Sequence, residues 1–264
     1  MPSVAVVSLS GGVGRTTLTA ALATLAARAG HASLAVDWDP QNLLALHFGV
    51  QAPPDEGLAA NSAAGKPWHT SALRSAEGVD VLPFGRLDTA QLRSWYPEMA
   101  NDRDWLAQRL AQLDVPPGAS GHSWTFIDTP RAPSQRTVQA LRAADFALLV
   151  LRPDPGALAL LPRALELAAT RPMLAVINGF DASRPLQQGV RAALQAQLGS
   201  RLVPHVVHRD EAVAEAWARL SPLHLQAPHA QATHDLHGLL RWLEGRLLPG
   251  LPQQVADEAA ADGA

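Results

Sequence analysis

Residues 4–17, VAVVSLSGGVGRTT, carry the clearest structural signal in this chain. Four apolar residues predict a buried strand, and a helical pattern over 16–29, closed by Gly30, follows the glycines. The glycines allow a tight turn that points backbone N–H groups at an anion, and a helix N-terminus adds roughly half a positive charge. The segment therefore predicts a phosphate-binding loop, with contacts from Gly11, Gly12, Val13, Gly14, Arg15, Thr16 and Thr17.

Further apolar runs extend this pattern along the chain. They are near-continuous rather than alternating, as expected for strands buried on both faces of a parallel sheet. Helical patterns lie between most of them, so we predict a doubly wound α/β fold with a mostly parallel sheet. The predicted strands cover 4–7, 33–36, 79–82, 125–127, 147–151 and 174–177, with a seventh over 202–207, and the later helices cover 89–112, 134–143, 157–169, 186–198 and 233–248.

A single domain accounts for most of the chain. Its 264 residues are enough for one large α/β domain and leave little for a second. Residues 51–78 form the longest stretch without clear periodicity, and we interpret them as a surface insertion. We expect a nucleotide-binding domain over 1–251. The Pro, Gln, Ala and acidic residues that dominate 252–264 predict a disordered tail.

Composition narrows the class of protein. Hydrophobic residues make up 47% and charged residues 17%, which indicates a globular chain with a sizeable core. There is no cysteine, which excludes disulfides and thiolate metal sites, and the N-terminus does not resemble a signal peptide. No apolar run approaches the ~20 residues of a membrane span. We therefore expect a soluble, cytoplasmic protein without direct membrane insertion. The net charge of −3 argues against coating nucleic acid by charge alone.

Two acidic motifs follow predicted strands. Residues 36–41 are VDWDPQ and residues 126–130 are FIDTP, which places Asp37, Asp39 and Asp128 at strand ends. Ligands bind at the carboxyl ends of strands in open α/β sheets, and a hard cation that bridges two phosphates needs carboxylates there. A single Asp after a strand is more often a cap or turn residue. Together with the glycine loop, the three favour a nucleotide site with Mg²⁺, on which the Thr16 hydroxyl can also act as a ligand.

The glycine loop departs from the strict pattern G-x-x-x-x-G-K-[ST], because Leu9 takes the place of the first glycine. Residues 10–17 instead resemble the deviant Walker A loop K-G-G-x-G-K-[ST]-T of the ParA/MinD family of P-loop NTPases. This resemblance implies bound ATP and Mg²⁺. It also implies that Asp37 lies near the water shell of the metal, that Asp39 orients the attacking water, and that Asp128 holds the metal through water.

Both lysines of that family motif are replaced. Arg15 stands where the family has its phosphate-cradling lysine, and it keeps the charge on a bulkier, planar group. Since only one of the 21 basic residues is a lysine, compositional drift explains this change. Ser10 stands where the resemblance implies a lysine that reaches the phosphates of a dimer partner, and serine cannot make that contact. Loss of such a cation costs orders of magnitude in rate. We therefore expect ATP binding with weak hydrolysis, slow or dependent on another protein.

The nucleotide base has its own candidate contacts. Asn178 follows the run 174–177 and matches a family asparagine at the adenine edge, where an amide can both donate and accept. A capping role for this asparagine stays open. Residues 203–211, VPHVVHRDE, fit the family loop that flanks the base, which adds Pro204 and His205 to the predicted nucleotide contacts.

Three further segments narrow the resemblance. They are DVLPFG over 80–85, IDTPR over 127–131 and HRDEAVAE over 208–215. Together with the replaced lysines they resemble the BcsQ (YhjQ) family of cellulose-secretion proteins, over residues 3–248. The resemblance implies an ATP-dependent homodimer that docks small cytoplasmic subunits (BcsR-like and BcsE-like). It also implies a cytoplasmic assembly or regulatory factor that is recruited to the inner-membrane cellulose synthase.

Other functions compete with this one. A DNA-partitioning ATPase of the ParA type would use basic residues, and residues 131–220 carry eleven arginines against seven acids. We favour a solvated arginine face over a DNA-binding one. A MinD-like membrane-cycling ATPase would lay the leucines of 239–248 on a membrane, although at helical spacing they are more often the core face of a last helix. A scaffold that binds no nucleotide is the remaining alternative.

Overall fold

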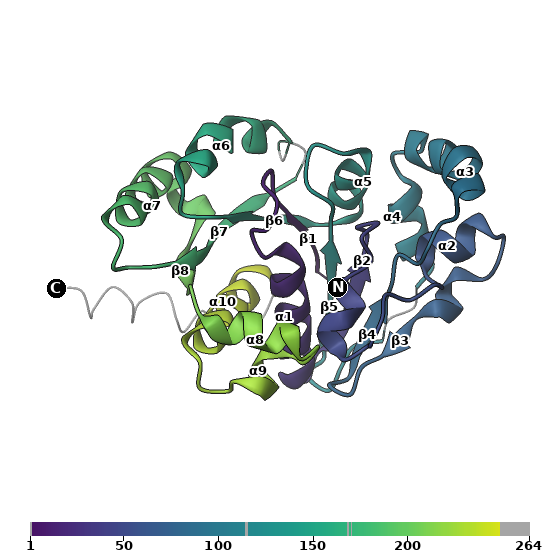
Figure 1. Cartoon of the computed structure of the whole chain (residues 1–264), viewed down its shortest axis with the longest axis horizontal. Coiled ribbons are helices and arrows are strands. Elements are labelled where there is room, and N and C mark those ends of the chain that lie inside the picture. The colour runs from purple at the N-terminus through teal and green to yellow at the C-terminus, as the bar shows by residue number, and fades with distance from the viewer. Residues whose placement is uncertain (1, 114–115, 168, 170, 249–264) are drawn as a thin grey trace.

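The computed structural model describes residues 2–113, 116–167, 169 and 171–248. The predicted tail over 252–264 and the last residues of the predicted domain, 249–251, lie outside these ranges. Within them, eight strands form one sheet in the order β3-β4-β2-β5-β1-β6-β7-β8, with helices on both faces (Figure 1). Every strand pairing is parallel except that of β3 with β4. The predicted doubly wound fold is confirmed.

All seven predicted strands are present, and β3 is an addition. The strands are β1 Ser3–Val7, β2 Ala32–Asp37, β3 Leu73–Arg74, β4 Val79–Leu82, β5 Ser123–Asp128, β6 Phe146–Leu151, β7 Met173–Phe180 and β8 Leu202–His208. The α-helices are α1 Arg15–Arg28, α2 Leu58–Ala63, α3 Thr89–Asn101, α4 Trp105–Leu110, α5 Gln135–Ala143, α6 Pro155–Leu167, α7 Pro185–Leu198, α8 Glu211–Ala218, α9 Leu223–Gln226 and α10 Gln231–Leu247. Short 3-10 turns are η1 Leu44–Phe48, η2 Trp68–Ser71 and η3 Gly199–Arg201.

Alternation along the strands divides the core into two layers. In β1, Val4 and Val6 belong to the layer covered by α1 and α10, whereas Ala5 and Val7 belong to the layer covered by α5, α6 and α7. Successive side chains of a strand point to opposite faces, so a strand between two helical layers needs apolar residues at every position. This requirement explains the near-continuous apolar runs. It also leaves polar side chains to the strand ends.

The predicted helix over 89–112 is wrong as one element, because the structure breaks it into α3 and α4. The buried Gln139 amide of α5 donates to the carbonyl oxygens of Met99, at 2.9 Å, and Asp102, at 2.7 Å. Asp102 in turn accepts the backbone N–H of Asp104 at 2.9 Å. These side-chain bonds satisfy backbone groups that a continuous helix would have used, so the chain turns here.

The segment 51–78 is more than a surface insertion, because several of its residues are buried in the domain although most of it is exposed. It contains α2, η2 and β3, and Leu58 and Trp68 are buried. The N-terminus of α2 docks on the end of β4, where the N–H of Leu58 donates to the carbonyl of Pro83 at 2.8 Å. Gly57 permits this approach, because an added Cβ would lie 2.3 Å from the nitrogen of Gly85. Elements this short produce no periodic pattern in the sequence.

The C-terminal leucines pack inside the domain. Leu239, Leu240 and Leu243 of α10 are each at most 3% exposed and lie in the same core layer as α1. The core-face interpretation of this helix is therefore correct. Among the described helices, none has the length and apolar character needed to cross a membrane.

Candidate nucleotide-binding site

The phosphate loop lies between β1 and α1, at the carboxyl edge of the sheet. Gly12 and Gly14 have φ angles of 65° and 91°, in the left-handed region that favours glycine. Gly14 is the N-cap of α1 and offers no side chain to the first turn of the helix. An added Cβ at Gly14 would lie 2.3 Å from the amide nitrogen of Asn178, whereas Gly11 faces open space. The loop is therefore open beside Gly11 and closed by the Asn178 side chain beside Gly14.

Asn178 holds this loop from the neighbouring side of the sheet. Its side-chain amide, near the end of β7, donates to the carbonyl oxygen of Val13 at 2.7 Å. The structure thus brings this predicted base contact to the phosphate loop. It also gives the residue a positioning role that the sequence did not indicate, because the two residues lie 165 positions apart.

Two carboxylates meet at the ends of neighbouring strands. Asp37 of β2 and Asp128 of β5 are register partners and are both fully buried. The Asp37 carboxylate accepts the N–H groups of Asp39, at 3.0 Å, and Leu44, at 2.9 Å. One oxygen of Asp128 accepts the Thr16 hydroxyl at 2.7 Å, and the other is buried without a partner. The arrangement leaves one carboxylate oxygen free for a ligand.

Burial makes this carboxylate pair hard to ionise. Burial, reinforced by the Asp128 charge, raises the pKa of Asp37 well above its usual range. Burial also raises the pKa of Asp128 to about 7, against the opposing effects of the Thr16 hydroxyl and the Arg15 charge. Two carboxylates without a cation resist holding two negative charges side by side. A divalent cation removes that restriction.

Arg15 is held within the site by two contacts. Its guanidinium donates to the Ser8 hydroxyl at 2.9 Å and lies 3.5 Å from a carboxylate oxygen of Asp39. The side chains of Arg15 and Asp39 are 11% and 9% exposed, so water screens this ion pair only partly. The cation that replaces the lysine of the loop is thus shared with the carboxylate that was predicted to orient water.

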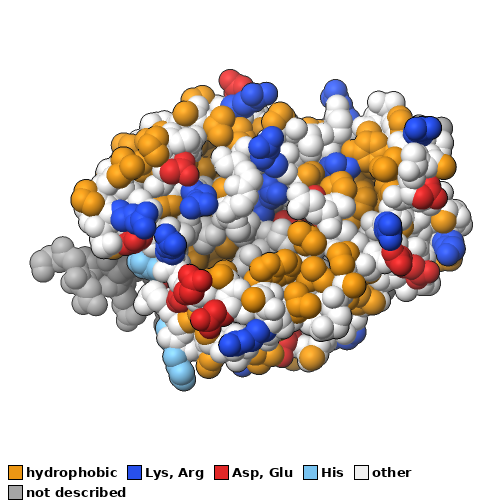
Figure 2. Space-filling view, viewed as in Figure 1, with side chains coloured by type: hydrophobic (Ala, Val, Ile, Leu, Met, Phe, Trp, Pro, Cys, Tyr) orange, Lys and Arg blue, Asp and Glu red, His pale blue; other side chains and the backbone are white. Residues whose placement is uncertain are grey.

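A cleft of about 540 Å³ opens over these groups. Its lining contains the whole predicted phosphate loop together with Asp39 and Asp128, whereas Asp37 lies behind it. Figure 2 shows basic side chains near the middle of the view, above a broad hydrophobic area. Six further residues line the cleft that are not among the predicted contacts, namely Gln41, Leu43, His47, Pro130, Arg131 and Trp217.

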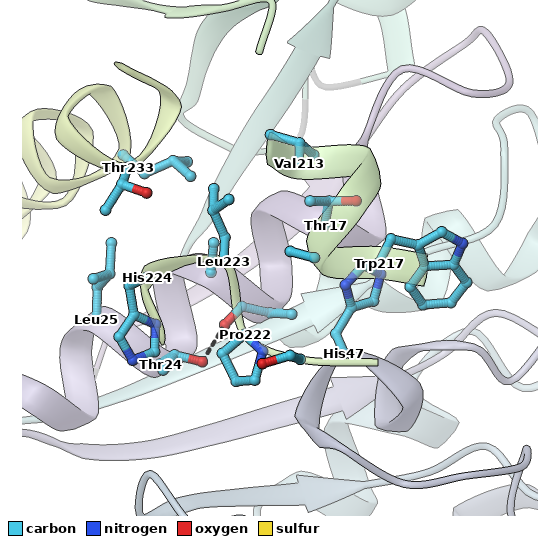
Figure 3. Close-up of a pocket in the computed structure, with 15 residues that line it drawn as sticks. Thr17, Thr24, Leu25, His47, Val213, Trp217, Pro222, Leu223, His224 and Thr233 are labelled. Atoms are coloured by element: carbon cyan, nitrogen blue, oxygen red, sulfur yellow. Dashed lines mark hydrogen bonds between the residues drawn. The ribbon is translucent and has the colours of Figure 1, made fainter. Parts of the chain in front are cut away.

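Three of these residues could be predicted from the motifs that contain them. Pro130 and Arg131 belong to the IDTPR motif, and Gln41 belongs to DPQ, so their motifs already pointed to the site. His47 and Trp217 come from η1 and α8, and no sequence pattern connects them. Their rings lie 4.3 Å apart beside Thr17, where they also border a smaller cavity (Figure 3). Burial lowers the pKa of His47 to about 4, so this ring is neutral at pH 7.

The structure does not bring Pro204 and His205 to the cleft. Both lie within β8, where Pro204 is exposed and the His205 ring packs against α10, 3.3 Å from where a Cβ of Gly238 would stand. Val207 is the residue of β8 that pairs with Asn178. The carboxyl end of this strand is therefore formed by residues after 207 rather than by the predicted pair.

The residues of this cleft fit a nucleotide with Mg²⁺. The loop leaves open space beside Gly11 and Gly12, and the unpartnered oxygen of Asp128 is buried next to a hydroxyl. Carboxylate and hydroxyl oxygens are ligands of Mg²⁺. A glycine loop between strand and helix, with aspartates at the ends of two adjacent parallel strands, defines a P-loop protein with the ParA/MinD fold.

Comparison with known proteins identifies the family to which the chain belongs. The family described as "Cellulose biosynthesis protein BcsQ" matches residues 1–243. The BcsQ protein of Escherichia coli is 33% identical over 237 residues, which cover 88% of this chain and 90% of that protein. The chain belongs to the BcsQ family of cellulose biosynthesis proteins.

More distant relatives agree with the fold. The chromosome-partitioning ATPase Soj of Thermus thermophilus is 27% identical over 92% of this chain and 96% of its own length. The structure of the septum site-determining protein MinD from Pyrococcus horikoshii, complexed with Mg-ADP, superposes with a TM-score of 0.73. It covers 92% of this chain and 96% of that one at 22% identity. These similarities support the architecture of the sheet and its loop.

Proposed function

We propose that this chain binds ATP, forms a homodimer when ATP is bound, and serves as an assembly or regulatory factor for bacterial cellulose synthase. Membership of the BcsQ family supports the link to cellulose. One observation carries the nucleotide part. The glycine loop, Asp39 and Asp128 line the same cleft, and a buried oxygen of Asp128 has no partner there.

Each group of the site has a defined task in this proposal. Backbone N–H groups of residues 11–17 hold the phosphates. Thr16 would hold Mg²⁺ through its hydroxyl and Asp128 would hold it through water, with Asp37 near the water shell, and the metal would neutralise charge on the phosphates and carboxylates. Asp39 orients the water for hydrolysis. Asn178 fixes the loop through Val13, and its amide contacts the adenine edge in this proposal.

Hydrolysis is slow in this proposal, or depends on another protein. Ser10 brings no charge to the phosphates of a dimer partner. The ion pair with Arg15 ties Asp39 to the loop at 3.5 Å, so this contact has to open before the carboxylate can orient water. Retained binding with weak turnover suits a protein whose ATP-bound form recruits partners. By family analogy, these are small BcsR-like and BcsE-like subunits at the cytoplasmic side of the inner-membrane synthase.

Light scattering on the purified protein tests dimer formation. With Mg²⁺ and ATP the molar mass should double, whereas ADP should leave it unchanged. Asp39→Ala should keep the ATP-bound dimer and abolish whatever hydrolysis the wild type shows. Asp55→Ala, at an exposed residue in a weak ion pair with Arg86, is the matched control and should change neither property.

Two results would contradict the proposal. Calorimetry that detects no uptake of Mg-ATP at millimolar concentration would remove the nucleotide site. Loss of ATP binding in Asp39→Ala would refute the role given to that carboxylate. Restoring both lysines, with Ser10→Lys and Arg15→Lys, should raise hydrolysis, and an unchanged rate would place the deficit outside the loop.

A DNA-partitioning ATPase is the second candidate, favoured by the similarity to Soj. The net charge of −3 weighs against it. DNA retention that falls steeply between 50 and 200 mM salt, on the order of a thousandfold, would support this alternative. We expect no retention at the higher salt concentration.

A further inference from the structure

The cleft has one cationic side chain without a task. Its lining contains three groups that can carry positive charge, namely Arg15, His47 and Arg131. Arg15 is engaged with Ser8 and Asp39, and the low pKa of His47 keeps that ring neutral at pH 7. Arg131 is exposed, and its side chain forms no hydrogen bond or ion pair with any other residue that the structure describes.

The backbone around Arg131 is fixed on both sides. Before it, the Thr129 hydroxyl donates to the carbonyl of Val6 in β1 at 2.8 Å. After it, the N–H of Ala132 donates to the carbonyl of Ser8 at 2.9 Å. The segment is therefore fastened to the strand and residue that lead into the phosphate loop. Only the side chain of Arg131 remains free to adjust to a ligand.

The cleft contains little positive charge that is free to bind a third phosphoryl group. Two carboxylates, Asp39 and Asp128, line it together with a cation that Asp39 already shares. Ser10 supplies none of the charge that a lysine would bring. A nucleoside triphosphate carries one more phosphoryl group than a diphosphate. A guanidinium can bind phosphate oxygens through two parallel hydrogen bonds.

We propose that Arg131 binds the terminal phosphoryl group of ATP in the cleft of its own chain, supplying the cation that Ser10 does not. This inference rests on the proposed function, because it needs the nucleotide in this cleft. It goes further by naming the residue that distinguishes ATP from ADP. Arg131 thereby couples the segment after β5 to the presence of a third phosphate.

The ratio of two affinities tests this assignment. Calorimetry at protein concentrations where the chain is monomeric would measure the Kd of a non-hydrolysable ATP analogue and of ADP, both with Mg²⁺. Arg131→Gln should weaken the analogue by about tenfold or more, the usual effect of losing a charged hydrogen bond, and should change ADP by less than about twofold. Arg163→Gln, at an exposed arginine of α6, is the control and should leave both unchanged.

The possible outcomes separate cleanly. Equal weakening of both nucleotides, or no weakening of the analogue, would overturn the assignment. An effect confined to concentrations at which the protein dimerises would place Arg131 on the nucleotide of a partner, and would also overturn it. If wild type binds neither nucleotide, the proposed function itself fails. Should the Gln variant not fold, Arg131→Lys replaces it, with a smaller loss for the analogue and none for ADP.

Discussion

Gly14 shows how a single residue keeps the phosphate loop open. It combines a φ of 91° with a neighbour, the Asn178 amide, that would lie 2.3 Å from an added Cβ. Gly11 belongs to the same motif but has neither constraint. The motif in the sequence does not separate these two glycines, whereas the structure assigns them different requirements.

We predict that Gly14→Ala abolishes nucleotide binding and destabilises the fold by about 1–3 kcal/mol, because the strained backbone and the collision with Asn178 add. Gly11→Ala is the matched control and should cost less than about 1 kcal/mol. Urea unfolding and calorimetry with Mg-ATP measure the two effects. Equal behaviour of the two variants would show that the loop is not held as described.

His47 gives the site a pH dependence of definite sign. Its pKa is 6.5 in the unfolded chain and about 4 in the folded one, so the folded protein resists protonation of this ring. Stability is therefore lost as pH falls from 6.5 towards 4, by at most about 3 kcal/mol. Asp37 and Asp128, whose pKa values are raised, act in the opposite direction over an overlapping range.

We predict that His47→Phe, which keeps a ring against Trp217, removes this dependence. As pH falls from 7 to 4, the free energy of unfolding of the wild type should decrease relative to that of the variant. Both proteins contain the two aspartates, so the difference isolates His47. Urea unfolding at several pH values measures it, and a constant difference would mean that the ring is not shielded from water.

At the scale of elements, the sequence predicts strands better than it predicts the ends of helices. Strands between two helical layers must be apolar throughout, and such runs are visible without any tertiary information. The break between α3 and α4 depends on Gln139, which comes from α5, beyond the next strand, β5. The sequence around Asp102 therefore gives no sign that the helix ends there.

We predict that Gln139→Leu lowers the free energy of unfolding by about 1–3 kcal/mol, because it removes the amide donor that the carbonyls of Met99 and Asp102 share and leaves them only backbone N–H partners. Gln195→Leu is the control. Gln195 is exposed on α7 and donates to Gly199 at 3.2 Å, so its loss should cost less than about 1 kcal/mol. Thermal unfolding compares them, and equal losses would remove Gln139 as the cause of the break.

For the whole molecule, the fold class and the phosphate loop follow from the sequence, and the walls of the site do not. The loop and the strand-end aspartates meet because parallel strands end at one edge. Arg131, His47 and Trp217 reach the cleft from three separate connections, whose spatial order only the folded chain defines. Pro204 and His205 are predicted nucleotide contacts from a motif match, and the structure has both within β8 and outside the lining of the cleft.

The last helix supports the domain as a whole. We predict that Leu240→Ala in α10 destabilises the protein by about 2–5 kcal/mol, as expected for a buried leucine that is 3% exposed. Leu225→Ala, at a residue that is 51% exposed, should have little effect. Urea unfolding measures stability and liposome flotation measures lipid binding. Loss of flotation with stability intact would instead make α10 a membrane-binding face.

The contact between Arg15 and Asp39 has a consequence for how the resting protein is kept idle. While this contact lasts, the Arg15 charge offsets that of Asp39, which under the proposed function weakens the polarisation of an attacking water. An anion that draws the guanidinium away leaves that carboxylate bare, so occupancy and readiness arise in the same event. In such a chain, the anion that binds also frees the carboxylate, so hydrolysis cannot begin before the nucleotide is bound.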